Sequence, residues 1–127
     1  MSYIDLLTKI KNAQAVKKEN VKIPYSKMNE AVADILAKNK YLAGFEKKGR
    51  GPKKILDIRL KYQEGQGAVT GIKFVSKPSR RIYIGYADLK PVKQGYGIGV
   101  ISTPKGIKTT MDAKKNKIGG EILFEIW

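Results

Sequence analysis

The hydrophobic pattern changes its period part-way along the chain, and this change restricts the fold more than any other feature. Before residue 63, two segments repeat apolar residues about every 3.6 positions, as in an α-helix with one buried face. After residue 68, apolar and polar residues mostly alternate, as in a β-strand. The segment Gln63–Gly67, which holds two glycines, separates the two patterns. The sequence therefore predicts an α+β fold of two small subdomains, an α/β N-terminal half (residues 1–63) packed on a mostly β C-terminal half (residues 68–127).

Two amphipathic helices are predicted in the first half. Ser2, followed three residues later by Asp5, can cap the first turn of a helix over about residues 2–13. Pro24 and Ser26 are typical of the start of a second helix, over about residues 26–39. The faces expected in the core are Tyr3, Leu6, Leu7, Ile10 and Ala13 on the first helix, and Met28, Ala31, Val32, Ile35 and Leu36 on the second.

Strand patterns occur in both halves. In the first half they cover residues 41–47 and 53–62, with an additional short strand over 21–23, and the alternation places Asp57 on the solvent side. In the second half, strands are expected at residues 72–74, 82–86, 96–102 and 121–127, with a short helix starting near Thr110.

Charge gives the first indication of function. The 127 residues include 26 Lys and Arg against 11 Asp and Glu, so the formal net charge is +15, and both halves are basic. Self-repulsion of this size destabilises an isolated domain, which favours a polyanionic partner. The chain has no Cys and no His, which excludes thiol nucleophiles, cysteine zinc sites and the commonest general base. No apolar stretch is long enough to span a membrane, and the N-terminus lacks the features of a signal peptide.

Two other classes of function stay open from the residues alone. A nucleic-acid-processing enzyme would need a carboxylate-bound metal, and Glu121 and Glu125 lie on the same side of the predicted last strand. A membrane-surface protein would need a basic amphipathic helix, whereas the first helix has an ordinary core-facing stripe. The glycines of Gly95–Gly99 lack the spacing of a nucleotide-binding fingerprint and lead into a strand. We expect no cofactor, no metal and no enzymatic activity.

Side chains suited to RNA gather near predicted turns of the second half. Arg81 and Tyr83 share the outward face of one predicted strand, which places a guanidinium group beside an aromatic ring. The segment Ser102–Gly106 leaves another strand with two hydroxyls, a stiffening Pro104, a lysine and a glycine. Hydroxyl groups both donate and accept hydrogen bonds, so they can bind base edges and ribose 2′-OH groups as well as phosphates.

Five motifs along essentially the whole chain occur together in one known family. They are Asp5–Ala13, Val75–Pro78, Gly95–Ser102, Ser102–Gly106 and Gly119–Leu123. In these motifs and their order, the chain resembles the bacterial-type family of small-subunit ribosomal protein eight. The resemblance implies a structural protein of the small ribosomal subunit that binds the central domain of the subunit's rRNA and supports its assembly. In several bacteria, members also repress translation of their own operon's mRNA.

The resemblance also implies a set of RNA-binding residues. Arg81 and Tyr83 are added to this set because of their side-chain chemistry and not because of the resemblance. The residues that the resemblance implies are Thr8, Lys9, Lys11 and Asn12 on the first helix, Ser76, Lys77 and Pro78 in a turn, and Ser102, Thr103, Lys105, Gly106, Gly120 and Glu121 around an RNA-reading loop. The family loop usually reads Ser-Thr-Ser-Lys-Gly. Pro104 replaces its middle serine here, which removes one hydroxyl and one backbone N–H.

The partners implied are small-subunit rRNA, neighbouring small-subunit ribosomal proteins and the operon's own mRNA, with no membrane. Outside the ribosome, the protein is expected to be a monomer. The expected location is the ribosome, either in the cytoplasm or, if the protein is plastid-encoded, in the organellar stroma.

Overall fold

The chain forms two compact units, residues 1–68 and 69–127, in a computed structural model that describes residues 2–127. The side chain of Ser2, predicted to cap the first helix, lies outside the described residues. The first unit contains α1 (Ser2–Ala15), β1 (Asn20–Pro24), α2 (Lys27–Lys38), β2 (Leu42–Lys48), the 3₁₀ turn η1 (Gly51–Lys53), β3 (Ile55–Leu60), β4 (Tyr62–Gln63) and β5 (Gln66–Gly67).

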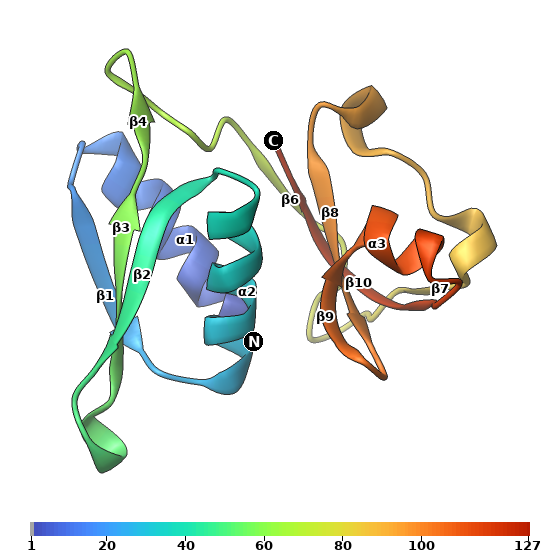
Figure 1. The fold of residues 1–127 in the computed structure, drawn as a ribbon, viewed down its shortest axis with the longest axis horizontal. Coiled ribbons are helices and arrows are strands. Elements are labelled where there is room, and N and C mark those ends of the chain that lie inside the picture. Colours follow the sequence, from blue (N-terminus) through green and yellow to red (C-terminus); the bar gives the residue numbers. More distant parts are fainter. Residues whose placement is uncertain (1) are drawn as a thin grey trace. The chain divides into compact units, whose positions relative to one another are not determined.

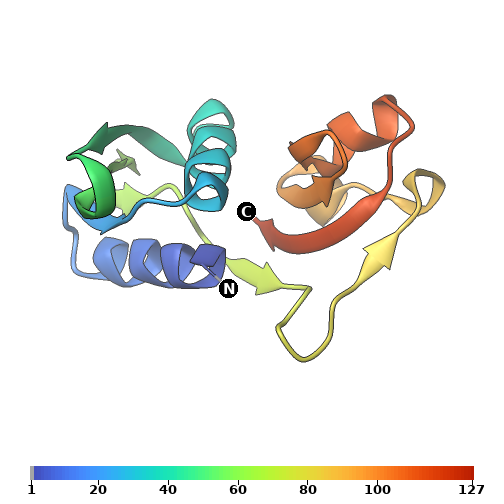
Figure 2. The ribbon, with the colours of Figure 1, turned by 90° about the horizontal axis from the view of Figure 1, so that it is seen from below.

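A three-stranded antiparallel sheet forms the base of the first unit, with β3 between β1 and β2. Both helices lie on one side of this sheet (Figures 1 and 2). The core face predicted for α1 is confirmed, since all five of its apolar residues are buried. Ser26 caps α2, where its hydroxyl accepts a hydrogen bond from the backbone N–H of Asn29.

One expectation for the first unit is corrected, and another is confirmed only in part. The buried face of α2 includes Asn29 and Ala33, whereas Met28 and Ala31 are only half-buried. Asn29 fits this face because its side-chain amide donates to the carbonyl of Pro24. Asp57 lies on the solvent side as predicted, since its paired residues Lys22 and Glu46 are exposed, but it is only 7% exposed itself. As part of the central strand, it is reached from both neighbouring strands, by Asn20 of β1 and Lys48 of β2.

The segment predicted to separate the two halves is itself folded. Gln63–Gly67 forms the β4–β5 hairpin, with Glu64 and Gly65 in left-handed conformations at its turn. This hairpin belongs to the first unit, and the chain divides after Ala68.

The second unit is mostly β, as predicted. It contains β6 (Ile72–Phe74), β7 (Tyr83–Ile84), the 3₁₀ turns η2 (Tyr86–Asp88) and η3 (Val92–Gly95), β8 (Ile98–Thr103), β9 (Gly106–Thr109), α3 (Thr110–Lys115) and β10 (Gly120–Ile126). The strand order is β6-β10-β8-β9, and β7 also pairs with β10 (Figure 1). Ala113 of α3 packs into a small core with Leu89 and Ile101. No helix in residues 2–127 has the length and apolar character needed to cross a membrane.

An irregularity in β10 separates Glu121 and Glu125, which the sequence predicted to lie on the same side of the last strand. Glu121 pairs with Ser102 and Glu125 with Gly99, but the register shifts by one residue between Ile122 and Phe124. Because side chains alternate faces along a strand, the extra residue reverses the alternation. Glu121 and Glu125 therefore face opposite sides of the sheet, which corrects the expectation that they share one.

Candidate nucleic-acid interface

The predicted RNA-reading loop is the tight turn between β8 and β9. Thr103 pairs with Gly106, which leaves Pro104 and Lys105 as a two-residue loop, both of them exposed. Proline fits the second position of such a turn because its ring fixes φ near −65°. Gly106 has a φ of +108°, a conformation that favours glycine. The loop therefore presents a proline and a lysine from a rigid base.

The hydroxyl of Thr103 maintains this turn. Its Oγ1 donates to the carbonyl of Gly106 at 2.7 Å and accepts from the backbone N–H of Lys105 at 3.1 Å. The residue is only 9% exposed. Its single donor is used within the loop, so Thr103 shapes the turn and does not offer a free O–H to a ligand as the sequence suggested.

Ser76 plays the same part beneath a second turn. The backbones of Lys77 and Arg80 pair through two hydrogen bonds of 2.9 Å and leave Pro78 and Ser79 at the tip. Ser76 is completely buried, and its hydroxyl donates to the carbonyl of Ile122 and accepts from the N–H of Ile82. The RNA contact predicted for Ser76 stays a prediction, and in the structure its side chain anchors the turn from inside.

Three predicted residues form a row across neighbouring strands. Glu121 of β10 lies directly opposite Ser102 of β8 on one side and Tyr83 of β7 on the other. Directly paired residues project from the same face of a sheet, with Cβ atoms about 4.5–5.5 Å apart. A hydroxyl, a carboxylate and an aromatic ring are thus side by side. We call Ser102, Glu121 and Tyr83 the reading row.

Gly120 allows β10 to approach β8 closely beside the reading row. A Cβ atom at this position would overlap the carbonyl oxygen of Ser102. A larger residue would therefore push the two strands apart where Glu121 and Ser102 meet. Gly120 contributes to the site through its backbone position.

Glu121 carries an acceptor that the protein itself leaves unpaired. Its Oε2 atom is buried and has no hydrogen-bond partner within residues 2–127. A buried acceptor without a donor is unfavourable, so such an atom favours a ligand that supplies an N–H or O–H. A carboxylate repels phosphate, so the chemistry that fits is a ribose 2′-OH or a base N–H.

Tyr83 supplies an aromatic surface beside this acceptor. Its side chain is 67% exposed, which leaves ring surface available for stacking a base. Arg81 is also exposed, but β7 begins only at Tyr83, so the two do not share a strand as predicted. The carbonyl of Ile82 still accepts from the N–H of Ile122 in β10, but the N–H of Ile82 donates to the hydroxyl of Ser76. Exposed cations close to the row in sequence are Lys77, Arg80, Arg81 and Lys105.

The predicted residues of the first unit lie on the solvent side of α1. Thr8, Lys9, Lys11 and Asn12 are all exposed. Lys9 borders two hollows of the surface, and the second is also lined by Asn12 and Lys18.

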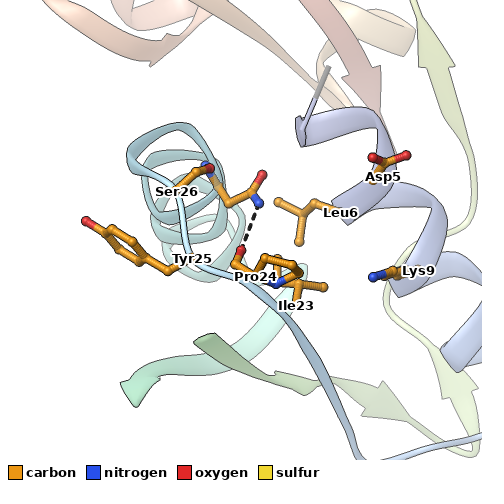
Figure 3. Close-up of a pocket in the computed structure, with 8 residues that line it drawn as sticks. Asp5, Leu6, Lys9, Ile23, Pro24, Tyr25 and Ser26 are labelled. Atoms are coloured by element: carbon orange, nitrogen blue, oxygen red, sulfur yellow. Dashed lines mark hydrogen bonds between the residues drawn. The ribbon is translucent and has the colours of Figure 1, made fainter. Parts of the chain in front are cut away.

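The first hollow has a volume of about 230 Å³ and is lined by Asp5, Leu6, Lys9, Ile23, Pro24, Tyr25, Ser26 and Asn29 (Figure 3). Asn29 is buried, and its Nδ2 donates to the carbonyl of Pro24 at 3.2 Å, the dashed line in Figure 3. Its Oδ1 has no partner in the described chain. This hollow therefore combines a cation with an unpaired acceptor.

Carboxylates are scattered in the structure. Over residues 2–127 no three acidic side chains come close enough to hold a metal ion together. The closest ion pair joins Lys48 Nζ to Asp57 Oδ2 at 2.9 Å. Hydrogen bonds from Lys48 and Asn20 hold the pKa of Asp57 below its usual value, and the bond to Asp57 raises the pKa of Lys48.

Comparison with known proteins identifies the family. The family model described as ribosomal protein S8 matches residues 3–127. The chain belongs to the ribosomal protein S8 family. The chain is 42% identical over 124 residues to the small ribosomal subunit protein uS8 of Ruegeria pomeroyi. The aligned region covers 97% of this chain and 95% of the relative. The chain is 44% identical over 123 residues to the protein of the same name from Ruminiclostridium cellulolyticum, covering 97% and 94%. These matches confirm the resemblance found in the motifs.

Within this S8-family chain, the sequence predicted the strands of the candidate site. It did not predict that the hydroxyls of Ser76 and Thr103 bond to backbone groups of the protein itself. Ser76 and Thr103 each stand directly at the start of a tight turn. Small hydroxyl residues at such positions commonly bond to nearby backbone, and this signal favours the structural role. The unpaired oxygen of Glu121 had no sequence signal, because it depends on what β7 and β8 place around it.

Proposed function

We propose that this protein is a structural constituent of the small ribosomal subunit that binds the central domain of the subunit's rRNA and supports its assembly. The observation that carries the proposal is the buried, unpaired Oε2 of Glu121, set between Ser102 and the exposed ring of Tyr83. Family membership supports the same function, since the relatives are named small ribosomal subunit proteins. The protein acts as a binding component and not as an enzyme.

Recognition would depend on RNA shape. The deep major groove of regular RNA helices excludes side chains, whereas irregular or partly unpaired stretches expose sugars and base edges. An unpaired nucleotide can stack on Tyr83 and donate a 2′-OH or base N–H to Glu121, with Ser102 as a second polar contact. The cations at Lys77, Arg80, Arg81 and Lys105 would neutralise phosphates and position the RNA.

The exposed face of α1 offers a second contact. Lys9 and Lys11 carry charge, and Thr8 and Asn12 can bond to sugar or phosphate. An operon mRNA that presents the same irregular shape would compete for the reading row. The protein would act in the ribosome, in the cytoplasm or in an organellar stroma, beside neighbouring small-subunit proteins.

The test compares two matched substitutions on one strand. Glu121→Gln replaces the unpaired carboxylate by an amide of the same shape, and Glu125→Gln makes the same change on the opposite face of β10. Binding is measured to a central-domain rRNA fragment and to an unrelated duplex of equal length. A hydrogen bond to a charged group contributes about 1–1.5 kcal/mol more than one to a neutral amide oxygen, so E121Q should lose about fivefold to tenfold of its affinity for the fragment. E125Q should bind like the wild type.

A thermal melt separates binding from folding. E121Q should melt no lower than the wild type, because the Oε2 atom that it replaces makes no hydrogen bond within residues 2–127. Equal affinity of E121Q and the wild type for the fragment would refute the role of Glu121. Equal affinity of the wild type for the fragment and the unrelated duplex would refute the proposed function as a whole.

A further inference from the structure

The loop between β2 and β3 carries the densest positive charge in the chain. Residues 47–54 read Lys-Lys-Gly-Arg-Gly-Pro-Lys-Lys, with five cations and no acid in eight positions. All eight residues are exposed. We call this segment the basic hairpin tip. It belongs to the first unit and contains none of the residues expected to bind RNA.

The basic hairpin tip has a defined conformation. The N–H of Lys53 donates to the carbonyl of Arg50 at 3.1 Å, and that of Lys54 donates to Gly51 at 3.3 Å, which closes the 3₁₀ turn η1. The N–H of Tyr25, which precedes α2, donates to the carbonyl of Lys54 at 3.1 Å. The cations are therefore displayed on an ordered turn, which lowers the entropy lost on binding.

Only part of the charge is balanced within the protein. Lys48 pairs with Asp57 and approaches Glu46, and Lys47 lies 3.9 Å from a carboxylate oxygen of Glu30. For Arg50, Lys53 and Lys54, the described residues supply no ion pair. Three cations of the tip are thus available to an external anion.

Tyr25 indicates what kind of anion fits. The ammonium groups of Lys47 and Lys54 lie 5.1 and 5.6 Å from the centre of its ring, and its hydroxyl lies 3.5 Å from Glu30. Because the protein's own cations occupy the ring, it does not offer a stacking surface for a base. The tip therefore presents dense positive charge without a free aromatic ring for stacking, and this combination suits phosphates.

We propose that the basic hairpin tip binds the sugar–phosphate backbone of RNA, as a contact separate from the reading row. This inference rests on the proposed function, because it takes RNA as the partner. Each cation that neutralises a phosphate releases counterions, so the tip strengthens binding in a manner that salt weakens. It contributes equally to all RNA sequences of suitable shape and leaves selection to the reading row.

The first experiment removes the three unpaired cations in the variant R50Q/K53Q/K54Q. The control K17Q/K38Q/K40Q removes three exposed lysines at the opposite end of the same sheet, one of which, Lys38, is paired with Asp34. Lys40 precedes the start of β2, and the three substituted residues of the tip follow its end, about 20 Å away along the strand. Affinity for the central-domain fragment and for an unrelated duplex is measured over a range of salt concentrations, with melting curves for both variants.

The tip variant should lower the slope of log affinity against log salt by about 2, because each phosphate that a cation neutralises adds about 0.7–0.9 to that slope. The control should change it by less than half as much. The preference for the fragment over the duplex should stay the same. Equal slopes for the two variants would overturn the inference, and so would loss of the preference in the tip variant. If the wild type did not prefer the fragment over the duplex, the proposed function would be refuted instead. The salt dependence of the two variants could still be compared on either RNA.

The second experiment locates the RNA directly. The chain contains no cysteine, so P52C supplies a unique site at the tip for a tethered iron chelate that cleaves nearby RNA backbone. K38C on α2 is the matched control. Cleavage of the bound fragment from P52C and not from K38C supports the inference. Absence of cleavage from P52C, or a tip variant that binds RNA normally but loses a neighbouring ribosomal protein, would overturn it in favour of an acidic protein partner.

Discussion

The turns of the second unit and the basic hairpin tip of the first are stabilised by different forces. Beneath the two turns of the second unit lie the buried hydroxyls of Ser76 and Thr103, each bonded to backbone groups. At the base of the basic hairpin tip, Lys48 forms an ion pair with Asp57. The side chain of Lys48 remains about half exposed.

In the proposed function, this difference separates the residues that select an RNA from those that attract it. Neutral buried hydrogen bonds do not change with pH and respond weakly to salt, so they keep the residues around the reading row in place under all conditions. The Lys48–Asp57 pair joins a half-exposed ammonium group to a carboxylate of low exposure, so salt screens it in part, and the proposed attraction of phosphates does not depend on this pair. Three substitutions test this contrast on stability, in order of decreasing effect.

Ser76→Ala should have the largest effect. It leaves the carbonyl of Ile122 and the N–H of Ile82 without their partner, and such groups cost about 1–3 kcal/mol when buried. Urea denaturation should show a loss of unfolding free energy in that range, equal at low and at high salt. Ser79→Ala, at the exposed tip of the same turn, is the control and should change stability by less than about 0.5 kcal/mol. A loss with S76A that disappears in high salt would contradict the contrast.

Thr103→Ala should have an intermediate effect. One side-chain donor and one acceptor are lost, but Lys105 and Gly106 are exposed and water can replace the hydroxyl. The expected loss is about 1 kcal/mol in the same denaturation measurement. Thr103→Ser keeps the hydroxyl and should restore most of this loss. If T103A were as stable as the wild type while RNA affinity fell, the hydroxyl would face the ligand after all.

Asp57→Asn should have the smallest effect, and the effect should depend on pH. Hydrogen bonds from Lys48 and Asn20 lower the pKa of Asp57 in the folded state, so its contribution is present above the unfolded pKa and is lost as the pH falls through the folded pKa. The pKa of Lys48 is raised, so its share is lost as the pH rises through that folded pKa. Melting temperatures of the wild type and D57N should therefore differ most near neutral pH.

The same two melting curves should converge in strong acid, in strong alkali and at high salt. Asp34→Asn is the control, since its carboxylate forms an exposed i,i+4 pair with Lys38 and should matter even less. A constant difference between D57N and the wild type at all pH values would show that Asp57 acts through packing and not through charge.

The sequence was sufficient for most of the fold, and the strands and turns that carry the candidate site were among the elements that it predicted. Apolar periodicity predicted the buried face of α1, and alternation predicted most strands, because burial of apolar surface decides both. The strand β9 was missed because Gly106–Thr109 is short and follows its partner after two residues. The burial of Asn29 and of Asp57 was not predicted, since polar residues are buried only where a partner from another element satisfies them.

The sequence by itself determined the two-part α+β fold, the excess of positive charge and the family, because each depends on residue types and their order. Tertiary structure alone decided which polar groups are used inside the protein and which remain for a ligand. The hydroxyls of Ser76 and Thr103 are hydrogen-bonded to backbone groups. Glu121 keeps an oxygen without a partner because its neighbours across the sheet come from β7 and β8. Hydrogen-bond satisfaction is a property of neighbours in space, and chain order does not specify those neighbours.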